Sequence, residues 1–470
     1  MSRAYYERLS TTSAAFLSAE SSKTFSHSTM LLVFEPGSLA GEERGVDFEA
    51  LWAGIEARLA TVPRARQRLR WTPLADHPVW VDDPDFNLEY HLRHTSLPHP
   101  GSEEQLHRMV ARIHAQRLDR NRPLWECWVL EGLEGGRFAM LWKTHHCMID
   151  PTSEGDLLEA LLSPDPDAEL PPVAPYKPRP MPSAFELARD EISRGVRLPR
   201  AVSRRGVPRV DPEWRHELEL RARGVAKLLG YSIRPRGETP LSGPSGPHRR
   251  FTHRVLPLAD AQAVRQALGV SLHDVLLAVL SGAIRAFFAE RLVNPATLDF
   301  RVSAPVGLDT ETPGGDVGEW IVELPIWEKE PTARVDRIHQ QTAALHEASP
   351  ALGARTLLGV AQWTGSRRLT LSARAVSRRP VDLVLLNLPG PQTRLYFRGA
   401  ALLEGIAVAP LREDHALSLS VTSYDGQLGW GFNADFDRLP DLERFADALE
   451  EAFAELVASV RGQTPAAAGA

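Results

Sequence analysis

The spacing of apolar and polar residues predicts a mixture of strands and helices in the first third of the chain. Short apolar runs that end in turn-forming residues are typical of buried strands. The predicted strands are residues 29–34, 125–130 and 137–144, and the predicted helices are residues 48–59 and 109–118. In the first helix, Leu51, Ile55 and Leu59 fall on one side, as expected of a helix that packs on a sheet.

The second half of the chain repeats this mixture. A long apolar segment at residues 273–290 predicts a buried helix, and further helices are expected at residues 335–366 and 442–460. The predicted strands are residues 252–256, 297–305, 320–327, 381–388, 402–408, 416–424 and 428–433. Strands and helices in both halves indicate two α/β domains.

A proline-rich segment separates the two halves. Residues 164–182 carry too many prolines for helix or sheet pairing, and residues 183–231 follow with a helical pattern rich in arginine. At 470 residues, the chain is also longer than one hydrophobic core usually supports. We therefore expect an N-terminal domain at residues 1–163, a linker and helical connector at residues 164–239, and a C-terminal domain at residues 240–470.

Composition narrows the cellular setting. A formal net charge of -6 gives no reason to expect nucleic-acid binding. Cys127 and Cys147 are the only cysteines, so no disulfide framework is implied and a cytoplasmic location is expected. The first twenty residues do not match a signal peptide, and the most apolar run, residues 275–288, carries Arg285 and is expected to be too short to span a bilayer. Any membrane contact is therefore expected at a surface.

The strongest candidate for chemistry is the segment from Lys143 to Asp150, KTHHCMID. A histidine can take a proton from a hydroxyl and return it to a leaving group, because its pKa lies near neutrality. Acyl transfer from a thioester to an alcohol needs such a base, an oriented acceptor and a group that holds the oxyanion. In this interpretation His146 is the base, His145 shapes the loop, and Asp150 forms an ion pair with an arginine.

Two other interpretations of this segment stay open on the residues alone. Paired histidines after a strand can be satisfied polar groups at the edge of a sheet. Imidazoles and a carboxylate can also bind zinc, although no further cluster of cysteine or histidine completes a ligand set, so no metal is expected.

Several ordered motifs resemble the bacterial wax ester synthase/diacylglycerol acyltransferase family, which belongs with the CoA-dependent acyltransferases and the condensation domains of peptide synthesis. The family carries HHxxxDG, which His145, His146 and Asp150 match. Residues 118–126 (LDRNRPLWE) resemble its PLW region, and His273-Asp274 falls where the family has Asn-Asp. Further similar segments are residues 240–251, 387–391, 399–400 and 423–424. The resemblance extends from about residue 9 to residue 460.

This resemblance implies two chloramphenicol-acetyltransferase-like domains with mixed sheets and an active-site tunnel between them. It implies acyl-CoA as a substrate, with no separate cofactor, and a long-chain alcohol or diacylglycerol as acceptor. The catalytic residues would be His146, His145 and Asp150, and the substrate-binding residues would be Pro123, Leu124, Trp125, His273 and Asp274. A peripheral site at the inner membrane or on lipid inclusions is also implied, while the oligomeric state is not.

The chain departs from the family pattern at three positions. Pro151 replaces the glycine after the motif aspartate, His273 replaces the asparagine of Asn-Asp, and Glu319 follows Gly318 where the family has Gly-Asn. These departures motivate two alternatives to lipid synthesis. One is a specialised acyltransferase or condensation-like enzyme for a natural-product hydroxyl or amine, and the other is a non-catalytic protein that binds acyl-CoA or lipid.

Overall fold

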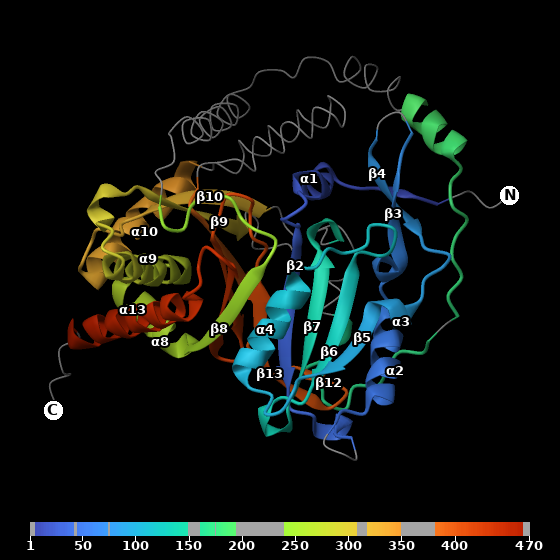
Figure 1. The fold of residues 1–470 in the computed structure, drawn as a ribbon, viewed down its shortest axis with the longest axis horizontal. Helices are drawn as coiled ribbons and strands as arrows, with labels where there is room; N and C mark the ends of the chain where they lie inside the picture. Colours follow the sequence, from blue (N-terminus) through green and yellow to red (C-terminus); the bar gives the residue numbers. More distant parts are fainter. Residues whose placement is uncertain are drawn as a thin grey trace.

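The computed structural model describes residues 5–41, 45–73, 76–148, 160–173, 175–193, 239–307, 317–348 and 381–463. These residues form two six-stranded mixed sheets and a smaller three-stranded sheet. The two large sheets lie side by side, and helices pack against both of them (Figure 1). The expected α/β class with two mixed-sheet domains is confirmed.

The first large sheet has the strand order β12-β13-β2-β7-β6-β5. Its strands from the N-terminal half are β2 (His27–Phe34), β5 (Leu92–Ser96), β6 (Trp125–Glu131) and β7 (Phe138–His145). Neighbouring residues of β2 face opposite sides: Leu32 packs in one apolar cluster with helix α2 (Phe48–Leu59), and Leu31 packs in another with helix α4 (Glu103–His114). Because both faces are covered, every residue of β7 is buried, which explains the unbroken apolar runs in the sequence.

The position of helix α4 corrects one prediction. The helix expected at residues 109–118 begins at Glu103 and ends at His114. Its start is set by Ser102, whose hydroxyl accepts from the amide of Gln105 while the Gln105 side chain accepts from the amide of Ser102. This reciprocal capping box was readable in the sequence as Ser-x-x-Gln and outweighs the apolar periodicity that placed the start later.

The second large sheet has the strand order β10-β9-β11-β14-β15-β8 and carries helices on one face. The strands are β8 (Arg249–Pro257), β9 (Phe300–Gly307), β10 (Val317–Leu324), β11 (Leu383–Pro389), β14 (Leu417–Tyr424) and β15 (Gln427–Asp435). The helices are α8 (Leu258–Leu268), α9 (Leu272–Glu290), α10 (Pro331–Ala348) and α13 (Leu442–Gln463). All the strands predicted for this half are found, whereas α8 was missed.

Helix α9 corrects the expectation that no apolar run reaches the length of a membrane span. It has 19 residues and is, among the described residues, the one helix long and apolar enough to cross a bilayer. Most of the apolar stretch of this helix, 72%, is buried inside the molecule, where it packs against α8, α10 and α13 (Figure 1). Core helices of this kind meet the same criteria of length and composition, so α9 is explained by packing.

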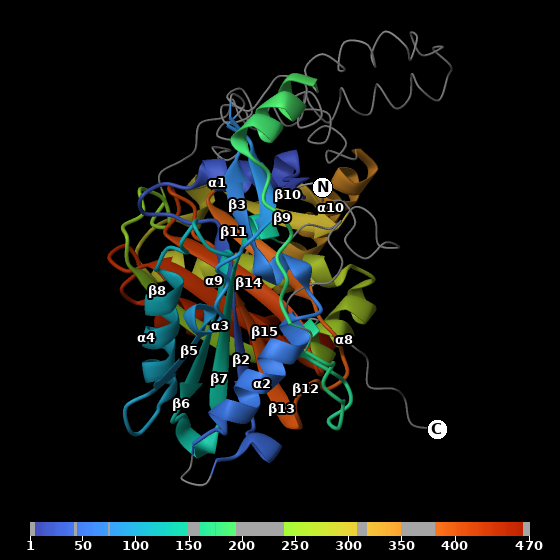
Figure 2. The ribbon, with the colours of Figure 1, turned by 90° about the vertical axis from the view of Figure 1, so that its right-hand side faces the viewer.

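Strands β12 (Tyr396–Phe397) and β13 (Ala400–Val408) join the two halves. Although they come late in the chain, β13 pairs antiparallel with β2 and extends the first sheet (Figure 2). Strand β13 also lies close to β15. The two backbones approach so closely that a Cβ on Gly431 of β15 would collide with the carbonyl oxygen of Ala407 in β13. The domain boundaries near residues 163 and 239 stay a prediction, since much of the chain between them lies outside the described residues.

Three short strands near the N-terminus form the smaller sheet. They are β1 (Glu7–Arg8), β3 (Gln67–Trp71) and β4 (Pro78–Asp82), in the order β1-β4-β3. The described part of the proline-rich segment at residues 164–182 has almost no regular structure, as expected. Arg179 in that segment donates twice to the carboxylate of Asp82, at 2.8 and 2.7 Å, and so fixes the segment on β4.

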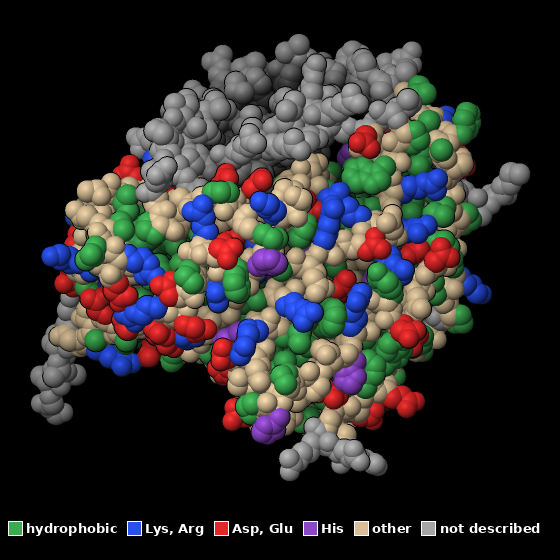
Figure 3. Space-filling view, viewed as in Figure 1, with side chains coloured by type: hydrophobic (Ala, Val, Ile, Leu, Met, Phe, Trp, Pro, Cys, Tyr) green, Lys and Arg blue, Asp and Glu red, His purple; other side chains and the backbone are tan. Residues whose placement is uncertain are grey.

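The surface carries charges of both signs. On the face shown in Figure 3, lysine and arginine side chains alternate with aspartate and glutamate, and apolar side chains are scattered among them. Such mixing gives no extended field of one sign on this face.

Candidate active site

The paired histidines lie where β7 ends and the short helix η4 (His146–Met148) begins. The backbone is held on both sides of this turn. The amide of His145 donates to the carbonyl of Leu124 at 3.0 Å, and the amide of His146 donates to the carbonyl of Ser26 at 2.9 Å. Helix α1 (Thr11–Ala19) lies against η4, so the turn is enclosed by an element that the sequence did not predict.

Both ring nitrogens of His145 have partners. Its Nε2 lies 3.1 Å from Oε1 of Glu20, and its Nδ1 accepts from the amide of Cys147 at 3.0 Å. An Nδ1 that accepts carries no proton, so Nε2 carries the proton that is donated to Glu20. Both side chains are buried, at 2% and 4% exposure. His145 is therefore held in one tautomer by fixed partners on two sides.

Glu20 is the acidic centre of this region. Its carboxylate also accepts from the amide of Ser26 at 2.9 Å and from Arg120 at 2.6 Å, and Arg117 lies 3.6 Å away. Burial raises the pKa of Glu20, but the hydrogen bond from His145, with those from Ser26 and Arg120, lowers the pKa overall to about 2. Glu20 is therefore anionic throughout the neutral range.

His146 differs from His145 in having a ring nitrogen without a partner. Its Nε2 is buried and has no hydrogen-bond partner among the described residues. Phe16 of α1 contacts the ring edge-on, with 5.1 Å between the ring centroids. Burial, together with the electrostatic effect of the neighbouring His145, lowers the pKa of His146 to about 4, so the ring is neutral at pH 7 and can accept a proton.

The residues Pro123, Leu124 and Trp125 are all buried beside this turn. Trp125 stacks on Trp142 and His91, with centroid distances of 5.0 and 4.6 Å, and its Nε1 donates to the carbonyl of Ala65 at 2.8 Å. These contacts fit a tryptophan in the core. The direct link from this segment to the site is the Leu124 carbonyl, which receives the His145 amide. A role in substrate binding stays a prediction.

His273 and Asp274 lie in the first turn of α9. Asp274 forms a capping box with Ser271 and also accepts from Thr342 at 2.6 Å and from His339 at 2.9 Å. The Nε2 of His273 is buried without a hydrogen-bond partner among the described residues. Within that part of the chain, no hydrogen bond or ion pair joins either residue to His145 or His146.

Two motif positions lie outside the description. Asp150 and Pro151 are not among the described residues, so the expected ion pair of Asp150 stays a prediction. Glu319 belongs to β10, where its backbone pairs with Pro305.

Within the described residues, no group of three or more histidine, cysteine, aspartate or glutamate side chains is arranged to hold a metal ion. Cys147 and Cys127 are buried, and burial raises the pKa of both thiols, which disfavours the thiolate form.

A layer of buried polar residues lies behind the histidines and was not predicted from the sequence. On one face of the first sheet the apolar residues give way to His27 and Thr29 on β2 and to Lys143 and His145 on β7, with His27 opposite His145. Lys143 donates to the carbonyls of Ile113, at 3.0 Å, and Gln116, both at the end of α4. Burial lowers the pKa of Lys143 to about 8. The signal in the sequence was the alternation of Lys143 and His145 within an otherwise apolar strand.

His114, the last residue of α4, belongs to the same layer. Its Nδ1 lies 2.9 Å from Oγ1 of Thr29, and its carbonyl lies 2.6 Å from Nε2 of His27. Burial holds the pKa values of His27 and His114 well below the usual value for histidine. These rings are therefore neutral, and they surround the catalytic candidates with fixed dipoles.

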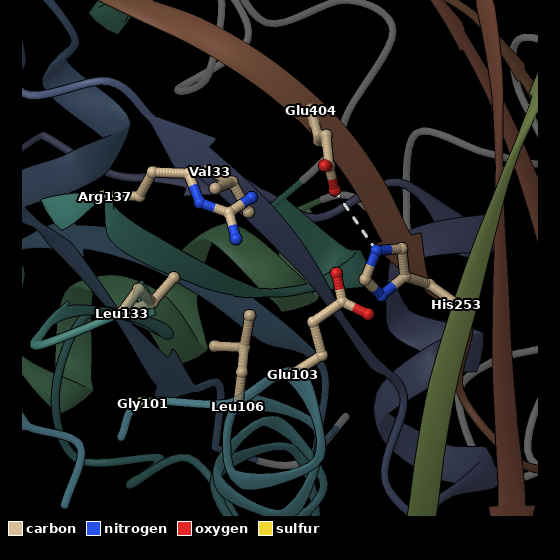
Figure 4. A pocket seen from close by; sticks show the side chains of 8 residues that line it. All are labelled: Val33, Gly101, Glu103, Leu106, Leu133, Arg137, His253 and Glu404. Carbon is tan, nitrogen blue, oxygen red and sulfur yellow. Dashed lines mark hydrogen bonds and ion pairs between the residues drawn. The ribbon is translucent and has the colours of Figure 1, made fainter. Parts of the chain in front are cut away.

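A small pocket lies elsewhere, where α4, β8 and β13 meet, and it contains none of the predicted site residues (Figure 4). In it His253 faces Glu404, with 3.2 Å between Nε2 and Oε2. Its lining residues are Val33, Gly101, Glu103, Leu106, Leu133, Arg137, His253 and Glu404.

Solved structures show the same arrangement of the two sheets. A wax ester synthase/diacylglycerol acyltransferase from Marinobacter aquaeolei VT8 matches with a TM-score of 0.68 and 25% identity, over 97% of this chain and all of that one. The first condensation domain of the CDA synthetase matches with a TM-score of 0.56 and 16% identity, over 97% and 98% of the two chains, and shares the fold. The fold and the histidine turn therefore define a two-domain acyltransferase.

Sequence comparison identifies the family. The wax ester synthase/diacylglycerol acyltransferase catalytic domain matches residues 9–276, and the WS/DGAT C-terminal domain matches residues 314–457. Two Mycobacterium tuberculosis proteins assigned as diacylglycerol O-acyltransferases are 32% and 30% identical, each over 96% of this chain and over 90% and 96% of their own lengths. The chain belongs to the wax ester synthase/diacylglycerol acyltransferase family, as the resemblance indicated, and is an acyltransferase.

Proposed function

We propose that this acyltransferase transfers the acyl group of an acyl-CoA to a long-chain alcohol or a diacylglycerol, with His146 as general base. The description of the family and the names of the relatives support the acceptor class. The observation that carries the role of His146 is its buried, unpartnered Nε2, beside a His145 with both nitrogens engaged. Acyl-CoA is a substrate in this proposal, and no cofactor is required.

In the proposed reaction, Nε2 of neutral His146 accepts the proton of the acceptor hydroxyl while the oxygen attacks the thioester carbonyl. The tetrahedral intermediate collapses with loss of the carbon–sulfur bond, and the proton passes from the imidazolium to the CoA thiolate. Since the pKa of His146 is about 4, the ring is in its accepting form at pH 7. His145 holds the loop, and Asp150 is proposed to hold it through an ion pair with an arginine. The residues proposed to line the substrate route between the domains are Pro123, Leu124, Trp125, His273 and Asp274.

A surface location is part of the proposal. Long-chain alcohols and diacylglycerols partition into lipid, so the enzyme is proposed to work in the cytoplasm and to meet them at the inner membrane or on lipid inclusions. Most of the long apolar helix α9 is buried in the core, so packing explains its apolar composition and the helix adds no support for this location.

The test measures release of the CoA thiol from palmitoyl-CoA, with and without a long-chain alcohol, a diacylglycerol and an amine. We expect acceptor-dependent release with the two lipids and a loss of about 10²-fold or more in His146→Ala. His94→Ala is the matched control, since His94 lies in the same sheet and is held by Glu131.

Each outcome of this assay decides between the alternatives. If His146→Ala keeps its turnover and shows native-like circular dichroism, His146 is not the base. Thiol release that depends on the amine, with no release for either lipid acceptor, would favour the condensation-like alternative. Tight palmitoyl-CoA binding without thiol release under any acceptor would favour the non-catalytic alternative.

A further inference from the structure

We propose that Glu20 is a positioning residue for His146, because its carboxylate anchors the two backbone contacts that flank this histidine. The inference rests on the proposed role of His146 as base. Glu20 is the residue that follows helix α1, and within the described part of the chain no hydrogen bond joins it to His146 itself.

The first contact runs through the ring of His145. Oε1 of Glu20 accepts the proton on Nε2 of His145, which leaves Nδ1 free to accept from the amide of Cys147. Cys147 directly follows His146. The carboxylate therefore selects the His145 tautomer that holds the backbone on the C-terminal side of His146.

The second contact runs through Ser26. The same Oε1 of Glu20 accepts from the amide of Ser26 at 2.9 Å, and the carbonyl of Ser26 accepts from the amide of His146 at 2.9 Å. The hydroxyl of Ser26 also donates to the carbonyl of Phe16, the residue whose ring contacts His146. Both backbone contacts around His146 therefore trace back to one carboxylate oxygen.

The other carboxylate oxygen is held by arginines. Oε2 of Glu20 lies 2.6 Å from Arg120, which also donates to the carbonyl of Leu17, and 3.6 Å from Arg117. The carboxylate is thus fixed from α1 and from the segment that leads to Pro123. Four groups converge on it, and it is 4% exposed.

A neutral side chain of the same size cannot reproduce this arrangement. A glutamine has one oxygen and one NH2 group, so it can accept from His145 and Ser26 or from Arg120, but it cannot accept on both sides. Either choice releases one set of contacts and leaves a buried donor unpaired. The ring of His146 then loses its fixed position relative to the reacting hydroxyl.

The test compares Glu20→Gln and Glu20→Asp with the wild type in the palmitoyl-CoA assay, with kcat expressed per folded molecule. We expect kcat to fall about 10²-fold in Glu20→Gln with little change in the KM of the acyl donor, because misplacement of a catalytic group acts on the chemical step. Glu20→Asp keeps the charge, but its carboxylate is one methylene shorter and cannot reach His145, Ser26 and Arg120 together. Its kcat is therefore expected to lie between those of the wild type and Glu20→Gln, although glutamine is the closer match in size.

The chain offers a matched control in Glu131. Oε1 of Glu131 likewise accepts from a histidine, His94 at 2.9 Å, and from a backbone amide, that of Val46 at 3.0 Å. Glu131→Gln removes the same charge from the same kind of contact, to a histidine of the same sheet. We expect it to leave kcat and KM unchanged.

The outcomes separate this inference from the proposed function. Wild-type kcat per folded molecule in Glu20→Gln, together with a loss in His146→Ala, would overturn the role of Glu20 and leave the base in place. If Glu20→Gln does not fold, wild-type kcat in Glu20→Asp overturns the role equally. An equal loss in Glu131→Gln would also overturn it, whereas activity in His146→Ala would overturn the proposed base.

Discussion

Asn433 on β15 donates its side-chain amide to Nε2 of His114 at the end of α4, with 3.2 Å between the two nitrogens. The same amide group donates to the carbonyl of Ala409 at 2.7 Å. Both side chains are buried, and His114 in turn contacts Thr29 on β2. A hydrogen-bonded chain therefore runs from the second sheet, through α4, to the strand that lies opposite the histidine turn.

Replacement of Asn433 by alanine is predicted to destabilise the protein. The change leaves Nε2 of His114 buried without its donor, and the carbonyl of Ala409 keeps only the Ser418 hydroxyl among the described residues, which together cost about 2 kcal/mol in the free energy of unfolding. Urea denaturation measures this difference. Asn121→Ala is the control, since Asn121 is exposed and its side-chain amide donates to the nearby Asp119. Equal midpoints for the two variants would contradict the prediction.

The acid sensitivity of the fold is predicted to depend on Glu20. Its folded-state pKa of about 2 lies below the ordinary value of 4.5, so the folded form binds its proton less readily than the unfolded chain. Its contribution, on the order of 3 kcal/mol, is present above pH 4.5 and is lost as the pH falls towards 2. Urea denaturation of the wild type and of Glu20→Gln should show that the difference in their free energies of unfolding becomes smaller as the pH falls from 7 to 3. A difference that stays constant over this range would contradict the role of Glu20 in acid sensitivity.

Local patterns in the sequence predicted the elements that surround the site, but not how they meet. The helix at residues 48–59 was predicted at its observed bounds, and the strand at residues 29–34 was found within β2, because their packing faces follow regular periods. The pairing of β13 with β2 joins residues more than 350 positions apart, and nothing in the local pattern of β13 specifies that partner.

The candidate site was predicted unevenly for the same reason. His145 and His146 stand in one short segment, and the family resemblance singled them out. Glu20 lies 125 residues before His145, and a lone glutamate after an unpredicted helix has no local signal. His27 was missed because the predicted strand began two residues too late. Residues brought together by the fold become visible only when the topology is known.

The pH dependence of turnover is predicted to follow His146. Because burial and His145 lower its pKa to about 4, the base is neutral from pH 5.5 to 7.5, and kcat/KM should be flat over that range. Below pH 5 the ring becomes protonated and kcat/KM should fall, by tenfold for each further unit well below the pKa. The measurement is initial rates in short assays from pH 3.5 to 8, with circular dichroism at each pH to establish folding. An acid limb centred near pH 6.5 would mean that a different or more exposed group is the base.

Asp274 is predicted to act on stability through the start of α9. Its carboxylate accepts from Ser271, Thr342 and His339, so it ties the first turn of α9 to α10. Asp274→Ala removes the cap and the two side-chain contacts to α10, although the Thr342 hydroxyl keeps the carbonyl of His339 as an acceptor. The free energy of unfolding should fall by about 2 kcal/mol. The comparison is Asp47→Ala, which removes an exposed cap of α2 with a single acceptor contact to Ala50 and should cost about 1 kcal/mol. Because Asp274 is also proposed to line the substrate route, the KM for palmitoyl-CoA should rise in Asp274→Ala, measured per folded molecule. An unchanged KM together with lowered stability would limit Asp274 to its role at the start of α9.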